Sequence, residues 1–255
     1  MNVVVLAKSI PDPSGEAELG DDFLLKRESD GTLDPGDEFA IEAALQLVEG
    51  TGGEVVVVSM GPATAAAAIR RALSMGADRG VLISDDALRG SDVLATARVL
   101  AAAARRSTFE LVLAGVESTD GYTGTLPATV AELLGLPSAG FARRLEVSDG
   151  VARVERQTEA GYDVVQCALP ALVTVTSGAT EPRYPTLKGI MQSKQKPLEE
   201  LSLADLGLVA SDVAPTQRVV SVEAAPEKGA GEVIPADGTA ATRIADLLAE
   251  AKVIG

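Results

Sequence analysis

Short apolar runs rich in β-branched residues alternate with longer segments of helical periodicity through the first half of the chain. The runs occupy residues 3–7, 54–59, 80–83 and 111–114, and the helical segments occupy residues 38–49, 63–75, 92–105 and 124–134. Strands that alternate with helices of about ten to fifteen residues are typical of βαβ units. The sequence therefore predicts an α/β fold of Rossmann-like type, with three layers, a parallel sheet, helices on both faces and right-handed crossovers.

The pattern changes after Pro137. Residues 141–147, 151–156, 163–168 and 171–176 form short β-rich runs, with turn signals at Asp149-Gly150 and Ala160-Gly161. Asp-Gly between alternating runs is a strong hairpin signal. We therefore expect antiparallel strands that are added to the parallel core or lie beside it.

From about Thr180 the chain has no periodic pattern until an amphipathic helix over residues 239–251. A long irregular segment is commonly functional or wrapped on a partner. The sequence predicts a nucleotide-binding α/β domain over residues 1–180 and a C-terminal arm over residues 181–255. The arm is expected either to wrap another subunit or to pack back on its own domain.

Composition excludes several classes of function. The net charge of −15 disfavours nucleic acid and anionic membranes as partners, and the absence of His excludes Ser-His and Cys-His catalysis and His-ligated metal sites. Cys167 stands alone in an apolar run and is expected to be a small buried hydrophobe. No apolar stretch is long enough to span a bilayer and no signal peptide is recognisable, so a cytoplasmic bacterial protein without membrane insertion is expected.

The loop over residues 115–125 is the richest of the four loops expected at the carboxyl ends of the strands. Its glycines, threonines and following helix suit an anion, because small residues expose backbone N–H groups and a helix N-terminus carries partial positive charge. An ordinary capped loop is the alternative. No phosphate-binding loop for hydrolysis and no dinucleotide fingerprint follows the first strand, so a nucleotide is expected to bind without being hydrolysed.

Four acidic residues, Asp12, Asp34, Glu38 and Asp120, could be pictured as a metal or acid–base cluster. In so acidic a chain they are better interpreted as separate surface acids. We therefore predict no metal site and no catalytic residue.

Several stretches resemble, in order, the beta subunits of electron-transfer flavoproteins. They are Asp34-Pro35-Gly36-Asp37-Glu38-Phe39, Ser59-Met60-Gly61-Pro62, Ile69-Arg70-Arg71-Ala72-Leu73, Leu113-Ala114-Gly115 with Ser118-Thr119-Asp120-Gly121, Val154-Glu155-Arg156, Leu169-Pro170-Ala171 and Glu181-Pro182-Arg183-Tyr184-Pro185-Thr186-Leu187-Lys188-Gly189-Ile190-Met191. Each motif alone is weak, but together they are specific and cover nearly the whole chain.

The resemblance implies an electron carrier with no bond chemistry of its own. Such proteins pair this subunit with an alpha subunit that holds most of the FAD. They carry electrons from acyl-CoA dehydrogenases of fatty acid oxidation, or other primary dehydrogenases, to a membrane quinone reductase, the electron-transfer-flavoprotein–quinone oxidoreductase. The beta subunit of the family binds AMP in the sheet crevice.

Carried over position by position, the resemblance implies a set of cofactor-binding residues. The first strand would contact adenine through its backbone, and the Thr-rich loop would capture the phosphate. The set is Leu6, Ala7, Asp34, Pro35, Gly36, Asp37, Met60, Gly115, Glu117, Ser118, Thr119, Asp120, Gly121, Tyr122, Thr123, Gly124, Thr125 and Leu126.

The resemblance also implies a recognition loop that docks on dehydrogenases, with Leu187 as its hydrophobic anchor. One buried apolar residue can dominate a small interface. The implied residues are Arg183, Tyr184, Pro185, Thr186, Leu187, Lys188, Gly189, Ile190 and Met191. The alternative for Leu187 is a loop residue packed on its own protein, and Lys188, Lys194 and Lys196 are interpreted as a solvated basic fringe.

Two departures from the family pattern stand out. Gly36 occupies a position where many relatives have an aromatic residue near the flavin, and Gln157 replaces a carboxylate that pairs with the partner subunit. Two alternative functions also stay open. One is a bifurcating flavoprotein in which a second FAD replaces AMP and accepts hydride from NADH. The other is a stand-alone adenine-nucleotide-binding or signalling domain.

Overall fold

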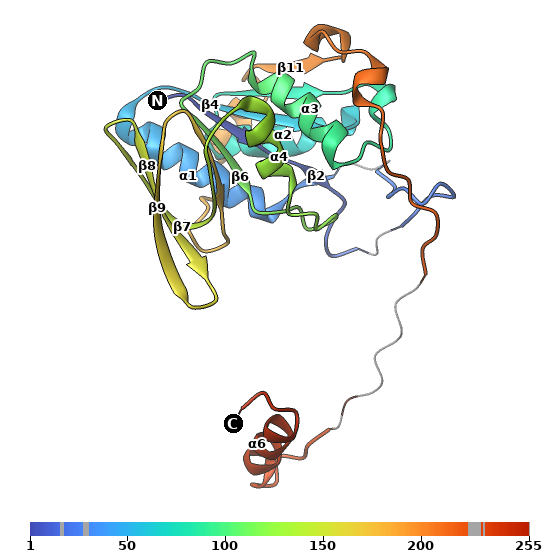
Figure 1. The fold of residues 1–255 in the computed structure, drawn as a ribbon, viewed down its shortest axis with the longest axis vertical. Coiled ribbons are helices and arrows are strands. Elements are labelled where there is room, and N and C mark those ends of the chain that lie inside the picture. Colours follow the sequence, from blue (N-terminus) through green and yellow to red (C-terminus); the bar gives the residue numbers. More distant parts are fainter. Residues whose placement is uncertain (16–17, 28–30, 224–230, 232, 255) are drawn as a thin grey trace. The chain divides into compact units, whose positions relative to one another are not determined.

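A nine-stranded, mostly parallel sheet forms the centre of the protein (Figure 1). The computed structural model describes residues 1–15, 18–27, 31–223, 231 and 233–254. Contacts divide the chain into two units, Met1–Val220 and Ser221–Gly255. The sheet lies in the first unit, and its strand order is β11-β5-β4-β1-β6-β10-β7-β8-β9. The predicted α/β class is confirmed.

The elements follow the predicted alternation through the first half of the chain. The strands are β1 (Val3–Leu6), β2 (Ser9–Ile10), β3 (Thr32–Leu33), β4 (Val55–Met60), β5 (Arg79–Ile83), β6 (Leu111–Gly115), β7 (Ser138–Ser148), β8 (Val151–Thr158), β9 (Gly161–Ala168), β10 (Ala171–Val175) and β11 (Leu198–Leu201). The α-helices are α1 (Pro35–Thr51), α2 (Ala66–Met75), α3 (Val93–Ala104), α4 (Leu126–Leu134), α5 (Leu187–Ser193) and α6 (Ala240–Glu250). Short 3-10 helices are η1 (Ala63–Ala65), η2 (Asp86–Leu88), η3 (Ala204–Leu206) and η4 (Ala210–Val213).

Alternate residues of the central strands face two hydrophobic cores. In β1, Val3 and Val5 join one core with residues of α1 and α2, whereas Val4 and Leu6 join the other with residues of α3 and α4. All four β1 residues are buried, as expected of a strand covered by helices on both faces. The cores therefore fix β1 in the middle of three layers, with its carboxyl end at the edge where ligands bind in such sheets.

The prediction of antiparallel strands after Pro137 is right for the hairpins and wrong for β10. Strands β7, β8 and β9 pair antiparallel, but β10 lies parallel between β6 and β7. Every residue of β10 is buried, so it is a central parallel strand. Cys167 on β9 is half-buried, not fully buried as expected, and its partial burial raises the pKa of the thiol.

The segment after Thr186, predicted to be aperiodic, contains helix α5 and strand β11. Strand β11 extends the sheet by pairing parallel with β5. Gly189 allows α5 to approach α2, since an added Cβ would lie 2.5 Å from the carbonyl oxygen of Ser74. Elements of seven and four residues are too short for a periodic pattern to show in the sequence.

Lys196 is not part of a solvated fringe. It is half-buried, and its ammonium group donates hydrogen bonds to three carbonyl oxygens at the end of α2, those of Leu73 (3.1 Å), Gly76 (3.0 Å) and Ala77 (2.6 Å). A cation in the last turn of a helix satisfies carbonyls that have no intrahelical partner. Lys196 therefore fixes the chain between α5 and β11 to the end of α2.

The second unit contains the predicted C-terminal helix, α6. No residue of α6 is buried, and its apolar side chains Ile244 and Leu248 are exposed. The proposed domain boundary at residue 180 stays a prediction, while the compact first unit extends to Val220. Among the residues that the structure describes, no helix is long and apolar enough to cross a bilayer.

The Lys196 contacts generate a stability prediction. Lys196→Met keeps the aliphatic stem but leaves three carbonyl groups at the end of α2 without this donor, so the free energy of unfolding should fall by roughly 2 kcal/mol. Chemical denaturation followed by circular dichroism measures the change. Lys194→Met, at an exposed position two residues earlier, is the matched control and should change stability little. Equal losses in the two variants would contradict the assigned role.

Candidate functional site

The strand order reverses between β1 and β6, and we refer to the region at the carboxyl ends of these two strands as the β1–β6 crevice. The chain runs from β1 to β4 and β5 on one side, then returns to β6 on the other side of β1. Ligands in open parallel sheets bind at such a reversal of strand order. Ala7 and Lys8 follow β1, and the loop over residues 116–125, which contains half of the predicted cofactor-binding residues, follows β6.

Asp34 connects the start of α1 to this loop. One carboxylate oxygen accepts the backbone N–H of Gly36 at 2.8 Å, which caps the helix, and the other accepts both the N–H (2.7 Å) and the hydroxyl (2.9 Å) of Thr119. The side chain is fully buried. Aspartate at a helix N-cap is locally favoured, and the Thr119 contacts extend this cap to a loop 85 residues away.

Asp37, in the first turn of α1, connects the ends of β1 and β6. Its carboxyl group accepts the N–H of Lys8 at 2.7 Å and the N–H of Gly115 at 3.3 Å. Gly115 is required by this approach, because an added Cβ would lie 2.9 Å from the Asp37 oxygen. Burial, and to a smaller extent the neighbouring Asp34 carboxylate, raises the pKa of Asp37 to about 8.

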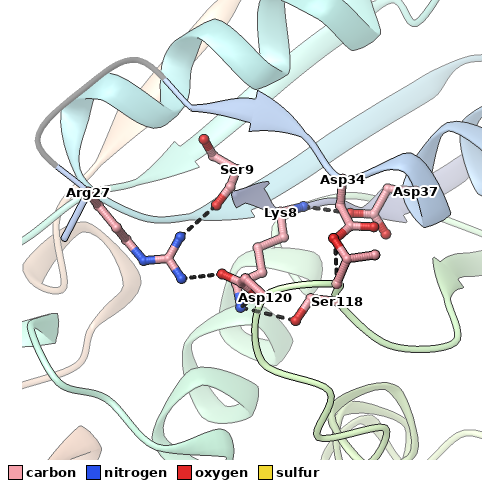
Figure 2. A network of polar contacts seen from close by, with 8 residues as sticks. Lys8, Ser9, Arg27, Asp34, Asp37, Ser118 and Asp120 are labelled. Carbon is pink, nitrogen blue, oxygen red and sulfur yellow. Dashed lines mark hydrogen bonds and ion pairs between the residues drawn. The ribbon is translucent and has the colours of Figure 1, made fainter. Parts of the chain in front are cut away.

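Two cations converge on Asp120, and Figure 2 shows their side chains reaching it from different segments. The Lys8 ammonium donates to Asp120 at 2.6 Å and to the Ser118 hydroxyl at 3.1 Å. Arg27 pairs with the second Asp120 oxygen and donates to the Ser9 carbonyl at 2.9 Å. Burial alone would raise the pKa of Asp120, but the hydrogen bonds and charges of Lys8 and Arg27 together lower it.

The interpretation of the acids as separate surface groups is wrong for Asp34 and Asp120. Asp34 is fully buried and the Asp120 side chain is only 7% exposed. The burial is stabilised by donors from distant segments, which the local sequence does not reveal. Among the described residues, no group of three or more His, Cys, Asp or Glu could hold a metal ion.

The structure divides the predicted cofactor-binding residues into a connected set and an outer set. Leu6, Ala7, Asp34, Gly36, Asp37, Gly115, Ser118, Thr119 and Asp120 lie on the connected segments at the ends of β1, β6 and the start of α1. Met60 ends β4, Leu126 begins α4, and Pro35, Glu117, Gly121, Tyr122, Thr123, Gly124 and Thr125 are exposed. Tyr122 and Gly124 adopt φ values of 47° and 61°, a backbone conformation that glycine accepts readily.

Sequence reasoning missed the side chains of Lys8 and Arg27. Lys8 could have been found, because a cation directly after a strand is placed at the ligand-binding edge. Arg27 gives no local signal: it lies 93 residues from Asp120 and outside any expected strand or helix.

The predicted recognition residues, 183–191, consist of four residues that precede α5 and the first five residues of α5, and we call them the recognition segment. The Thr186 hydroxyl accepts the Gly189 N–H at 3.0 Å at the start of α5. Arg183 donates to the buried Glu42 at 2.7 and 2.9 Å and to Glu49 at 2.5 Å, which attaches the segment to α1. The hydrogen bonds to Glu42 and Glu49 raise the pKa of Arg183. Burial alone would raise the pKa of Glu42, but its hydrogen bonds, chiefly those from Arg183, lower it.

Apolar side chains of the recognition segment are exposed. Leu187 is 76% exposed, and Tyr184, Ile190 and Met191 are exposed beside it in the sequence. Lys188 is also exposed, whereas Pro185 is half-buried. Leu187 is therefore not packed into its own protein.

Comparisons with known proteins agree with the resemblance. The model of the electron transfer flavoprotein domain matches residues 22–206. The chain is 42% identical to the electron transfer flavoprotein subunit beta of Mycobacterium leprae (strain TN), over 99% of each chain. It is 36% identical to the subunit of the same name from Bacillus subtilis (strain 168), over the full length of both, and 35% identical to the caffeyl-CoA reductase-Etf complex subunit CarD of Acetobacterium woodii, over 97% of this chain and 96% of that protein.

The pKa of Asp37 predicts a pH dependence of stability. Its native pKa of about 8 lies above the value of about 3.9 in an unfolded chain, so the native state keeps a proton that the unfolded state has lost. The stabilisation that the native state gains from binding this proton more tightly is fully present below pH ~4. It declines as the pH rises and is lost once the pH has passed through about 8.

The wild-type free energy of unfolding should therefore fall between pH 6 and pH 8 by about 1 kcal/mol per pH unit more than that of Asp37→Asn, which does not titrate. Urea denaturation at each pH measures both slopes. Parallel profiles for the two proteins would rule out an elevated pKa at Asp37.

Proposed function

The chain belongs to the electron transfer flavoprotein family as a beta subunit, and from this premise we propose that it binds AMP in the β1–β6 crevice and completes the FAD site of an alpha subunit. In this proposal it carries electrons from acyl-CoA and other primary dehydrogenases to a quinone oxidoreductase. The observation that carries the nucleotide assignment is the position of the glycine- and threonine-rich loop at the carboxyl ends of β1 and β6. The buried Asp34 holds this loop, and the buried Asp37 connects the two strand ends.

The residues present fit an adenine nucleotide. The loop backbone at Gly121 lies close to the Lys8 ammonium, since an added Cβ would lie 3.6 Å from it. Ser59, next to Met60 at the end of β4, has a buried hydroxyl without a hydrogen-bond partner among the described residues. Cationic groups, a glycine-containing loop beside them and an unsatisfied hydroxyl are the features expected where an anionic, hydrogen-bonding ligand binds.

Each segment has a separate role in this proposal. The backbone at the end of β1, at Leu6 and Ala7, orients the adenine ring. Asp34 holds the loop in place, and Asp37 connects the ends of β1 and β6. FAD, held largely by the alpha subunit, supplies the reversible uptake of electrons when bound. This chain contributes binding, orientation and docking, and forms or breaks no substrate bond.

The recognition segment is the proposed contact with dehydrogenases. Of its exposed apolar residues, Leu187, Ile190 and Met191 lie on α5. The ion pair between Arg183 and the buried Glu42 attaches the segment to α1. A short helix of this size suits a small interface with rapid dissociation, as a carrier that visits several partners requires. The apolar side of α6 is likewise proposed to be buried against the alpha subunit.

A bifurcating role is the second candidate. It is favoured by the similarity to a subunit whose name places it in a caffeyl-CoA reductase-Etf complex. In that case a second FAD would occupy the crevice in place of AMP and accept hydride from NADH. The stand-alone nucleotide-binding domain is disfavoured, because relatives named as subunits match the chain over nearly its full length.

Counting the bound nucleotides tests these proposals. The chain would be co-expressed with its alpha subunit, and the purified complex denatured and analysed by chromatography. One FAD and one AMP per heterodimer is the expected result. Two FAD without AMP would support the bifurcating role, and a chain that forms no complex and holds no flavin would contradict the proposed carrier function.

Leu187→Ala is predicted to weaken docking. Removing an exposed anchor should raise the concentration of flavoprotein needed for half-maximal reduction by an acyl-CoA dehydrogenase by roughly tenfold, because few residues dominate a small interface. Leu19→Ala, at another exposed leucine, is the matched control. The melting temperature of both variants should equal that of wild type, and an unchanged half-maximal concentration for Leu187→Ala would contradict the anchor role.

A further inference from the structure

Lys8 and Arg27 are placed so that they do more than neutralise Asp120. The Asp120 side chain is 7% exposed, whereas those of Lys8 and Arg27 are 38% and 31% exposed. The carboxylate therefore lies beneath, and both cations keep surface that faces solvent. A carboxylate in this position gathers the two cations at one point.

Both cations keep donors for a further acceptor. Among the described residues, Lys8 donates to Ser118 and Asp120, and Arg27 donates to Ser9 and Asp120. An ammonium group has three N–H donors and a guanidinium group has five. The Lys8–Arg27 pair can therefore bind the oxygens of an anion without releasing Asp120.

Some of the loop's own donors are already used within the protein. Both donors of Thr119, the amide and the hydroxyl, are committed to Asp34. The Tyr122 amide is committed to the Ser118 carbonyl at 2.9 Å. In a chain with a net charge of −15, a doubly charged phosphate would be repelled unless local cations compensate.

The pair lies among backbone segments at the ends of three strands. Gly121 carries no side chain that could separate the loop backbone from the Lys8 ammonium. On the other side, Arg27 borders a small pocket together with Ser9, Pro62 and Thr64, next to the carboxyl ends of β1 and β4. The two cations thus lie between the loop after β6 and the segments after β1 and β4.

We propose that Lys8 and Arg27 form a two-cation clamp for the phosphate group of a nucleotide in the β1–β6 crevice, and that Asp120 is the residue that positions both cations. The inference rests on the proposed nucleotide site and deepens it by assigning the groups that recognise the phosphate. Recognition of the base and ribose belongs to other residues, so loss of the clamp should affect only ligands that carry a phosphate.

Titration calorimetry of the full-length chain with AMP and with adenosine tests the clamp. Lys8→Met and Arg27→Met should each reduce AMP affinity by about tenfold or more, as expected for loss of a charge-assisted contact, and leave adenosine affinity unchanged. Arg27→Lys, which keeps the charge, should recover part of the loss. Arg89→Met is the control, since Arg89 pairs with Asp22 and contacts none of the crevice residues named above.

The outcomes separate the clamp from the site. Unchanged AMP affinity in both variants overturns the clamp and leaves the nucleotide site standing. An equal loss of AMP and adenosine affinity also overturns it, because the cations would then only hold the loop in shape. A wild-type chain that binds neither ligand overturns the nucleotide site together with the clamp.

A measurement on the wild-type chain covers the case of variants that do not fold. AMP affinity should fall as the KCl concentration rises, while adenosine affinity should stay constant, because only the phosphate makes ionic contacts. An AMP affinity that does not respond to salt would overturn the clamp.

Discussion

Two buried carboxyl groups at the start of α1 hold the site together. Asp34 and Asp37 accept hydrogen bonds from the end of β1, the end of β6 and the loop that follows it, and from α1 itself. Burying a carboxyl group is costly unless donors satisfy its oxygens, and here backbone amides and one hydroxyl do so. The donors of these segments reach the two carboxyl groups only when the segments lie close together, so the acids help to fix the relative positions of the segments. Protonation of Asp37 reduces the repulsion between the two groups.

The same principle fixes the recognition segment. Glu42 is buried on α1 and accepts hydrogen bonds from Arg183 and Gln46. Lys196 donates to the carbonyl of Leu73 on α2, and Arg70 of α2 donates to the carbonyl of Lys196. These contacts order the base of a segment whose apolar side chains stay exposed. A preordered docking element loses less conformational entropy on binding than a free loop would. The helical structure of α5, unexpected from the sequence, therefore suits the proposed role of engaging several partners briefly.

The sequence predicted what depends on local pattern and missed what depends on tertiary contacts. Runs such as residues 3–7 and 111–114 are apolar enough to require burial on both faces, and Asp149-Gly150 requires a turn, so the parallel core and the hairpin were predictable. Strand β10 has the same apolar character, but its own residues do not reveal that the chain returns to place it parallel between β6 and β7. The loop after β6 was located correctly. In the sequence, Asp34 and Asp120 resemble surface acids, because the partners that stabilise their burial are distant. Thr119 contacts Asp34 from 85 residues away, and Lys8 and Arg27 contact Asp120 from 112 and 93 residues away.

Helix α1 joins the two regions that the proposed function requires. Its first turn holds Asp34 and Asp37 at the crevice, and its later turns hold Glu42 and Glu49, which one guanidinium group of Arg183 bridges. Glu42 and Glu49 are seven residues apart, about two helical turns, so they lie on one face of the helix. A ligand that binds only the folded crevice stabilises this helix by mass action. Through α1, a nucleotide that takes no part in electron transfer would also support the base of the recognition segment, which gives a structural reason for an electron carrier to retain one.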